Sequence, residues 1–453
     1  MANVIKLRKG LDINLKGKAP KDVKLEVGKV AEYGLVPEAF EGVTPKVVVR
    51  EGDHVNAGDA LFVNKACPEV KFASPVSGTI STIERGKRRK VLCVKVKADA
   101  EQVFTDFGKK NVNSMDGEAV KQALLEAGLF GYINQLPYAV STTPDTKPKA
   151  IFVSALRDMP LASDFEVELA GNEEAFQTGL TALSKIAKTY LGVGVNQQHV
   201  ADVAGKDVEV NVFDGPCPAG NVGVQVNHID PVNKGEVVWT VDPASVIFFG
   251  RLFLTGKVDL HKVVAVAGSA VKHNGYATAL VGTPLEAIIP YEEFEPDAPV
   301  RFIVGNPLVG KESSTEFAYV EAHSSEFTAI PAGYDADEFL GWIMPRFDQF
   351  SVSRSYFSWL FGKNKEYDLD DRVKGGERHM IMSGEYDKVL PMDIYAEYLI
   401  KAIIAGDIDK QEQLGIYEVS PEDFAVAEFV DSSKLELQKI VREGLNILRK
   451  ENA

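Results

Sequence analysis

Residues 45–98 place the tightest limit on what this chain can fold into. The segment is a succession of short β-type runs, separated by turn signals at residues 52–53, 58–59 and 75–78. Apolar and polar residues alternate within the runs, as over 91–96, which is typical of strands that bury one face. Glycine and aspartate supply the tight turns between them. The segment therefore predicts a small all-β module built from short strands.

This segment resembles the biotinyl/lipoyl carrier domains. The resemblance rests on the spacing V-x-E-G-D-x-V-x-x-G-D-x-L over 49–61 and S-P-x-S-G-x-I over 74–80. Carriers present a modified lysine at a hairpin tip, but here the corresponding stretch reads N-K-A-C-P, with Lys65 displaced and a proline in the turn. We expect the carrier fold to serve as a docking surface, without modification of Lys65.

Length and composition set the wider frame. A chain of 453 residues is too long for one hydrophobic core, which predicts about three to four domains. With 45% hydrophobic and 25% charged residues, the composition is that of a folded globular protein. The net charge of -15 argues against nucleic acid or an anionic lipid surface as the main partner. It also agrees with ordinary solubility.

Membrane, cluster and metal signals are weak. The basic opening MANVIKLRKG leads into polar residues, and no stretch approaches the ~18 consecutive apolar residues of a membrane helix. We expect a cytoplasmic chain whose membrane association comes through a partner. Cys67, Cys93 and Cys217 lie far apart, whereas an iron–sulfur cluster needs about four thiolates. The histidines form no metal-binding pair, so no metal site is expected.

Residues 100–255 alternate between helical and strand patterns, which predicts a Rossmann-like parallel α/β domain. Asp116 is a suitable N-cap for a helix that runs to Glu126. The apolar run 150–155 predicts a strand covered on both faces. Residues 173–190 predict a long amphipathic helix, and residues 207–215 another strand.

The loop at residues 128–139, GLFGYINQLPYA, occupies the place of a nucleotide loop. Its position resembles that of the glycine-rich flavin and NADH loop in RnfC and in the NADH- and flavin-binding subunit of complex I. A loop that binds phosphate needs consecutive small residues so that backbone N–H groups reach the anion. Bulky residues replace them here, and the acidic turn that follows in those relatives reads R-D-M-P-L over 157–161. We expect the flavin and nucleotide site to be degenerate; retained flavin binding is the alternative.

The same loop carries an apolar and aromatic cluster. Its members Phe130, Tyr132, Leu136 and Tyr138 are our candidates for quinone binding, because a quinone ring and tail need apolar and aromatic surroundings. The alternative is that these side chains belong to the core. No catalytic, cofactor-binding or metal-binding residue is predicted in the chain.

Three later segments complete the prediction. The glycines at 215, 220 and 223 lie among prolines with no P-loop Lys-Ser/Thr, and we expect a surface loop at a subunit contact. Residues 263–289 contain two strand runs, a turn at 273–275 and a short helix that we expect to begin at residues 283–284. With this pattern, residues 256–329 resemble a soluble-ligand-binding β-grasp (SLBB) module. Residues 330–453 predict a mainly helical region with aromatic residues clustered at 356–361 and a terminal helix over 433–449. The predicted fold is thus α/β and multidomain, in four parts: 1–99 (lipoyl-like), 100–255 (Rossmann-like), 256–329 (SLBB-like) and 330–453 (helical).

From GLDINLKG through DGPCPAG to SGEYDKVLPMDIYAEYLIKAIIAGD, the chain resembles the NqrA family, the A subunits of the Na+-translocating NADH:quinone reductase. The resemblance implies a peripheral subunit on the cytoplasmic face of the bacterial inner membrane. Its partners would be subunits B to F, above all the membrane-embedded B subunit. The complex oxidises NADH, reduces ubiquinone or menaquinone and pumps Na+, with flavins and iron–sulfur centres in other subunits. This subunit would hold no complete active centre and no tightly bound cofactor.

Three hypotheses follow. The chain contributes to quinone binding, with electrons from a neighbouring flavin; or it is a purely structural docking subunit without a ligand; or it is a flavin-dependent NADH dehydrogenase similar to RnfC. A yellow purified protein is the mark of the third hypothesis.

Overall fold

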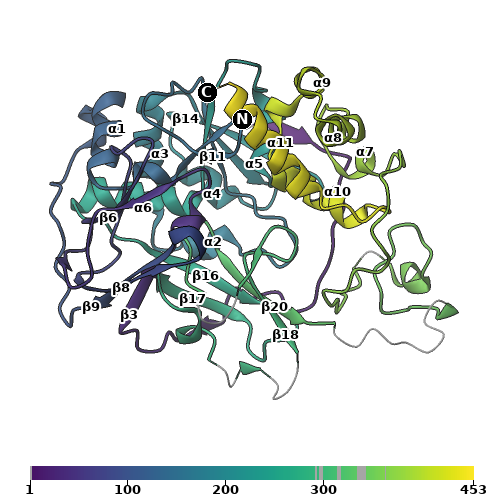
Figure 1. The fold of residues 1–453 in the computed structure, drawn as a ribbon, viewed down its shortest axis with the longest axis horizontal. Helices are drawn as coiled ribbons and strands as arrows, with labels where there is room; N and C mark the ends of the chain where they lie inside the picture. Colours follow the sequence, from purple (N-terminus) through teal and green to yellow (C-terminus); the bar gives the residue numbers. More distant parts are fainter. Residues whose placement is uncertain are drawn as a thin grey trace.

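The structure is a computed structural model that describes residues 3–290, 293–294, 299–313, 318–333, 343–362 and 364–452. The remainder of the predicted SLBB-like and helical regions, together with both chain ends, lies outside these residues. Four sheets and several helices are arranged around one large hydrophobic core and smaller ones (Figure 1).

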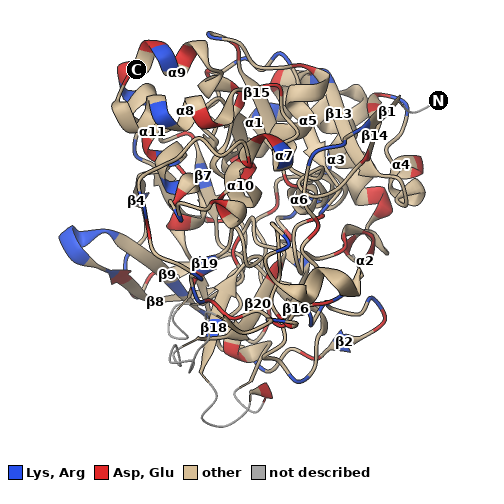
Figure 2. Cartoon of the chain, turned by 90° about the vertical axis from the view of Figure 1, so that its right-hand side faces the viewer, with Lys and Arg blue, Asp and Glu red and all other residues tan. Residues whose placement is uncertain are grey.

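The all-β module predicted for residues 45–98 is confirmed. One sheet has the strand order β3 (Glu32–Leu35), β9 (Val91–Ala98), β8 (Gly78–Arg85), β5 (His54–Val55). A second has the order β4 (Pro45–Val47), β6 (Ala60–Asn64), β7 (Lys71–Ala73). Side chains that alternate inward on these strands, among them Leu61, Ile80 and Val94, are fully buried. The outer half of the β8–β9 hairpin leaves the module and projects from the molecule (Figure 2).

The predicted α/β domain is built on a seven-stranded sheet. Its order is β1 (Asn3–Lys6), β14 (Val208–Asp214), β13 (Thr189–Gly194), β12 (Ile151–Ser154), β15 (Val238–Val241), β10 (Ile133–Leu136), β11 (Val140–Ser141). The first five strands are parallel, and β10 and β11 add an antiparallel edge. Part of the glycine-poor loop is thus a strand, whose backbone pairs with β15.

Helices cover both faces of this sheet. They are α1 (Gly117–Glu126), α2 (Phe165–Leu169), α3 (Glu173–Ile186), α4 (Gln198–Val203), α5 (Val222–Ile229) and α6 (Pro243–Thr255). The Asp116 cap is confirmed, since its carboxylate accepts from the Ala119 N–H at 2.8 Å. The helix predicted over 173–190 is too long: it ends at Ile186 because Thr189 and Tyr190 begin strand β13.

A third sheet follows in the chain. Its order is β19 (Lys311–Glu312), β18 (Val300–Val304), β20 (Glu326–Pro331), β16 (His261–Ala267), β17 (Gly275–Leu280), β2 (Lys24–Leu25). The helix predicted to begin at residues 283–284 is a single 3-10 turn, η5 (Leu285–Ala287). The SLBB assignment of this sheet stays a prediction.

The C-terminal part contributes α7 (Tyr386–Val389), α8 (Ala396–Ala405), α9 (Ile408–Gln413), α10 (Ala425–Val430) and α11 (Leu437–Glu451). They pack against the α5 side of the seven-stranded sheet, where Leu399 and Leu445 share a core with Phe213 and Val224 (Figure 1). Other 3-10 turns are η1 (Pro37–Ala39), η2 (Lys87–Arg89), η3 (Val112–Ser114), η4 (Phe130–Tyr132), η9 (Phe357–Phe361), η10 (Ile416–Glu418) and η11 (Pro421–Phe424).

The first 25 residues serve more than one part of the molecule. Strand β1 extends the seven-stranded sheet beside β14, and β2 extends the third sheet beside β17. The fourfold division at residues 99, 255 and 329 stays a prediction, and the N-terminal segment crosses it. Among the described residues, no helix is both long and apolar enough to cross a membrane.

Candidate functional site

A cavity of about 600 Å³ lies at the switch point of the seven-stranded sheet. Strands β13 and β14, which follow β12 in the chain, lie on one side of β12 in the sheet. The next strand, β15, pairs with β12 on its other side. The connections after β12 and β15 therefore diverge, which opens a crevice at their carboxyl ends. Ser154 and Leu156 line the cavity from the end of β12, and Val241 and Asp242 from the end of β15. In open α/β sheets this is the place where ligands bind.

The proline-rich loop before α5 forms one wall of this cavity. Ser154 Oγ donates to the Gly220 carbonyl at 2.7 Å, and the Gly220 N–H donates to Asp158 Oδ2 at 3.0 Å. A Cβ at Gly220 would lie 2.4 Å from the Leu156 carbonyl oxygen, so only glycine allows this approach. Only part of this predicted surface loop is at the surface, because Gly215 is exposed whereas Cys217 and Ala219 are buried. The predicted subunit contact stays a prediction.

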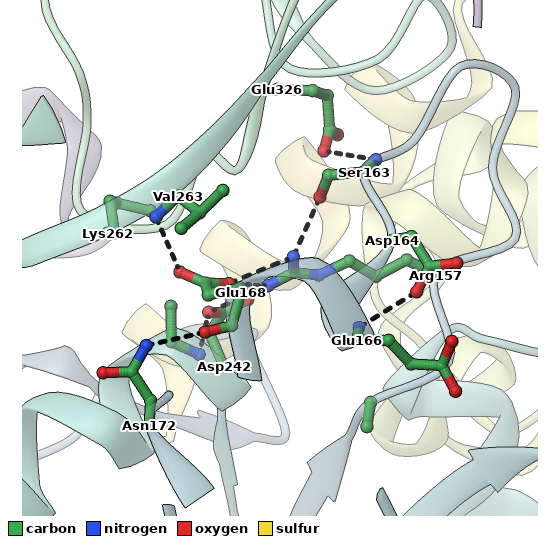
Figure 3. Close-up of polar contacts among 12 residues, drawn as sticks. Arg157, Ser163, Asp164, Glu166, Glu168, Asn172, Asp242, Lys262, Val263 and Glu326 are labelled. Atoms are coloured by element: carbon green, nitrogen blue, oxygen red, sulfur yellow. Dashed lines mark hydrogen bonds and ion pairs between the residues drawn. The ribbon is translucent and has the colours of Figure 1, made fainter. Parts of the chain in front are cut away.

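A buried network of charges forms the opposite side (Figure 3). Arg157 Nη1 donates to Ser163 Oγ at 2.8 Å, and both terminal nitrogens of Arg157 lie 3.3 Å from Glu168 Oε2. Asp242 lies 3.6 Å from the same guanidinium. Burial raises the pKa of Glu168, although Arg157 and Lys262 oppose the shift. The network fixes the Arg157 side chain beside the cavity.

The network also connects the α/β domain to the third sheet. Glu168 Oε1 accepts from the Val263 N–H of β16, and Glu326 Oε2 of β20 accepts from the Ser163 N–H, each at 3.3 Å. Buried Lys262 donates to the Ala322 carbonyl at 3.0 Å. Burial lowers the pKa of Lys262. These contacts hold the segment 322–326 against the cavity.

Two side chains of that segment have unsatisfied polar atoms. Ser325 is 4% exposed, and its Oγ has no hydrogen-bond partner among the residues that the structure describes. The same holds for His323 Nε2. Burial lowers the pKa of His323 to about 4, so its imidazole is neutral at physiological pH and can donate from one nitrogen. Both residues line the cavity.

Acidic groups from two segments complete the wall. Asp158 Oδ1 likewise finds no partner within the described ranges, and burial raises the pKa of Asp158 to about 6. Asp423, which lies next to the lining residue Glu422, accepts from the Ser420 N–H and from Ser420 Oγ, both at 2.8 Å. Burial raises the pKa of Glu422, and the neighbouring Asp423 adds to the shift. The cavity therefore holds carboxyl groups that bind protons more readily than exposed ones do.

Among the described residues, the lining carries no excess of positive charge, which a phosphate site would need. Five carboxyl side chains face three basic ones: Glu41, Asp158, Asp242, Glu326 and Glu422 against Arg157, Lys311 and Arg442. At the N-terminus of α6, Asp242 Oδ1 accepts from the Ala244 N–H at 2.9 Å. A carboxylate thus occupies the position in which a helix N-terminus would hold a phosphate. The cavity suits a neutral ligand better than a nucleotide or flavin phosphate.

Of the four predicted quinone-binding residues, only Leu136 lines the cavity. Phe130 and Tyr132 lie behind that wall in the main core, with Phe130 against Trp239 and Tyr132 against Phe40, at ring distances of 5.5 and 5.2 Å. The Tyr132 hydroxyl has no hydrogen-bond partner in the described part of the chain, and burial raises its pKa.

Tyr138, the fourth candidate, acts through its backbone. Tyr138 and Ala139 have left-handed φ angles of 84° and 48°, and their carbonyls accept from Arg442 at 2.8 and 3.2 Å. Arg442 comes from α11, so the C-terminal helix holds the end of the predicted quinone loop in place. The structure therefore brings Leu136 to the cavity and leaves Phe130, Tyr132 and Tyr138 behind or beside it.

The sequence did not single out the polar residues that line the cavity. Arg157 and Asp158 were noted as replacements of an acidic turn, and the Asp242–Pro243 pair is a recognisable helix start. His323, Ser325 and Glu422 carry no local signal, because their role depends on segments far away in the chain. No group of three or more metal-ligating side chains occurs within the described ranges.

Comparisons with known proteins agree with this architecture. Residues 5–99 match the family model of the NqrA N-terminal barrel-sandwich hybrid domain, and residues 115–258 match that of the NqrA second alpha/beta domain. A solved NAD+-reducing [NiFe]-hydrogenase in the H2-reduced state is similar over 51% of this chain and 52% of its own. Its 11% identity and TM-score of 0.34 are too low to bear on fold or function.

Curated relatives match over the full length. The A subunit of the Na(+)-translocating NADH-quinone reductase of Yersinia pestis bv. Antiqua (strain Angola) is 33% identical over 458 residues, covering 99% of this chain and 100% of the relative. The protein of the same name from Vibrio atlanticus (strain LGP32) is 33% identical over 450 residues with the same coverage. The chain belongs to the NqrA family, the A subunits of the Na+-translocating NADH-quinone reductase.

Proposed function

We propose that this chain is a peripheral subunit of a membrane-bound Na+-translocating NADH:quinone reductase and that it binds quinone in the cavity at the sheet switch point. The first part is supported by the names of relatives aligned over the full chain. Its partners are then subunits B to F, and the membrane-embedded B subunit is its anchor on the cytoplasmic face. NADH oxidation and Na+ movement belong to the other subunits.

The unsatisfied donors on the cavity wall are the observation that carries quinone binding. Ser325 Oγ and His323 Nε2 lack partners within the described ranges, and each buried polar group without a hydrogen bond costs about 1–3 kcal/mol. A quinone is neutral and presents two carbonyl acceptors that these groups can satisfy. Apolar lining from Leu136, Met159 and Val241 fits its ring.

Reduction of a quinone to a quinol takes up two electrons and two protons. The electrons come from another subunit of the complex. Asp158 and Glu422, whose pKa values are raised by burial, can hold protons next to the ring. The role of this chain is therefore to orient the quinone carbonyls and supply hydrogen bonds and protons.

The four sequence candidates enter this proposal with different roles. Leu136 contacts the ring, whereas Phe130 and Tyr132 support the wall from behind and Tyr138 shapes the rim through its backbone. Leu136→Ala should then raise the KM for quinone, and Tyr132→Phe, which keeps the ring, should leave it unchanged.

Ser325→Ala tests the proposal directly. Loss of one neutral hydrogen bond should raise the quinone KM of the assembled complex about fivefold, with the KM for NADH unchanged. Ser245→Ala is the matched control, because Ser245 Oγ is also buried and unsatisfied among the described residues but Ser245, on α6, does not line the cavity. Equal effects of the two variants, or none, would refute the quinone site.

A purely structural docking role is the second candidate. The observation in its favour is the exposed aromatic turn η9, where Phe357, Trp359 and Phe361 are exposed side chains. If docking is the entire role of the chain, the purified chain shows no saturable change in tryptophan fluorescence when a soluble quinone analogue is added. Visible absorption of the same sample tests for a bound flavin.

A further inference from the structure

The tip of the β8–β9 hairpin carries a dense positive charge on an acidic protein. Five of the six residues at 85–90 are basic, and all five are exposed: Arg85, Lys87, Arg88, Arg89 and Lys90. Figure 2 shows this tip projecting from the side of the molecule. The net charge of -15 therefore hides a local charge of the opposite sign.

Most of these charges are not neutralised within the chain. Lys90 pairs with Glu38 at 3.0 Å, and Arg85 Nη1 donates to the Arg89 carbonyl at 3.3 Å. For Lys87, Arg88 and Arg89, no ion pair with a carboxylate occurs within the described ranges. Because the Debye length is about 8 Å at physiological salt, acidic groups farther away on the body are largely screened from a projecting tip.

Two arginines of the tip have a backbone conformation that is unfavourable for residues other than glycine or asparagine. Arg88 and Arg89 have φ angles of 55° and 60°, and the Lys90 N–H donates to the Lys87 carbonyl at 3.2 Å. This is a turn with both central residues in the left-handed region, for which Asn-Gly is the favoured pair. Two arginines there cost conformational energy that a turn with only a structural role would avoid.

We propose that this hairpin tip binds the anionic phospholipid headgroups of a membrane surface. Headgroups require charge on flexible side chains and little shape complementarity. Protein interfaces are enriched in arginine and depleted in lysine, but their arginines stand beside buried aromatic and apolar anchors. No large apolar side chain is exposed between Val48 and Val103, a stretch that the structure describes in full, so the tip lacks such anchors. This inference goes beyond the quinone proposal and does not depend on it.

The double variant Arg88→Asn with Arg89→Gly tests the effect of the tip's charge on binding without weakening the fold of the hairpin. It installs the favoured turn pair and removes two charges, so the hairpin should fold at least as well. The full chain is sedimented with vesicles of phosphatidylglycerol and phosphatidylcholine in equal parts, and with phosphatidylcholine alone. Each basic residue contributes about fivefold to partitioning onto an anionic surface. The double variant should therefore bind about 25-fold more weakly to the anionic vesicles.

Two further variants complete the test. Arg88→Lys with Arg89→Lys keeps the charge and should keep the binding. Lys109→Asn with Lys206→Asn removes two exposed charges elsewhere and should have little effect. Equal binding to phosphatidylcholine alone, or equal losses from the control pair, overturns the proposal. So does a loss of co-purifying subunits from the lipid-free complex with Arg88→Asn and Arg89→Gly, since the tip would then contact protein.

Discussion

At the scale of single residues, the cavity is defined by polar atoms without partners. Asp158 Oδ1, His323 Nε2 and Ser325 Oγ are buried and unsatisfied among the described residues. The free-energy cost of these unsatisfied atoms is offset when a ligand supplies the missing hydrogen bonds. Residues that weaken folding in this way are typical of binding sites.

Asp158→Asn should make the stability of the chain less dependent on pH. Burial raises the pKa of Asp158 from 3.8 to about 6 in the folded chain. Below about pH 4, Asp158 is protonated in both the folded and the unfolded chain. As the pH rises from about 4 to 6, Asp158 ionises in the unfolded chain first, so the free energy of unfolding falls. Above about pH 6 it is ionised in both states, and the free energy of unfolding levels off. Asparagine keeps an acceptor for the Gly220 N–H and cannot ionise.

The variant should therefore exceed the original chain by about 3 kcal/mol in free energy of unfolding at pH 8 and equal it near pH 4. Thermal unfolding at the two pH values measures the difference. A constant gap at both values would show that ionisation of Asp158 is not the cause.

Local signals allowed some residues to be predicted and others not. The Asp116 cap was recognisable, because the cap residue and the N–H that it accepts from lie within one turn. Ser325 could not be identified, since its missing partner is a property of the folded surroundings. Tyr132 was chosen as an aromatic in the right loop, but a sequence cannot tell a cavity wall from the core behind it.

At the scale of elements, α11 controls one edge of the cavity. Arg442 extends from this helix and donates to the two carbonyls of the left-handed pair Tyr138 and Ala139. The pair lies between β10 and β11, so the contact links the C-terminal helix to the antiparallel edge of the seven-stranded sheet.

Arg442→Ala should destabilise the docking of α11. Two hydrogen bonds from a charged donor are lost, and the expected cost is about 2 kcal/mol. Limited proteolysis should then release the C-terminal region faster, and Tm should fall. Lys450→Ala, an exposed change on the same helix, is the control. Similar proteolysis of both variants would show that Arg442 does not hold the helix.

Elements with their own periodicity were predicted closely. Strands β12 and β14 and helix α1 fall within a residue or two of their expected ranges. Strands β1 and β2 were missed, because each is a short run whose partner lies far along the chain. The helix predicted over 173–190 shows a second limit of prediction from periodicity. The helical spacing of apolar residues continues for a few residues into a run that forms strand β13.

At the scale of the whole molecule, the cavity lies where several parts meet. Its wall combines loops of the α/β domain, the segment before β20 and the region around η11 and α11. The family was predictable because its resemblance extends along the whole chain. The site was not, because no single segment contains it.

A structure of the assembled complex with bound quinone is the most direct test of the central claim. The account predicts the quinone ring at the switch point, with its carbonyls within hydrogen-bond distance of Ser325 and His323 and its edge against Leu136. A quinone bound entirely to other subunits, with this cavity filled only by solvent, would contradict it.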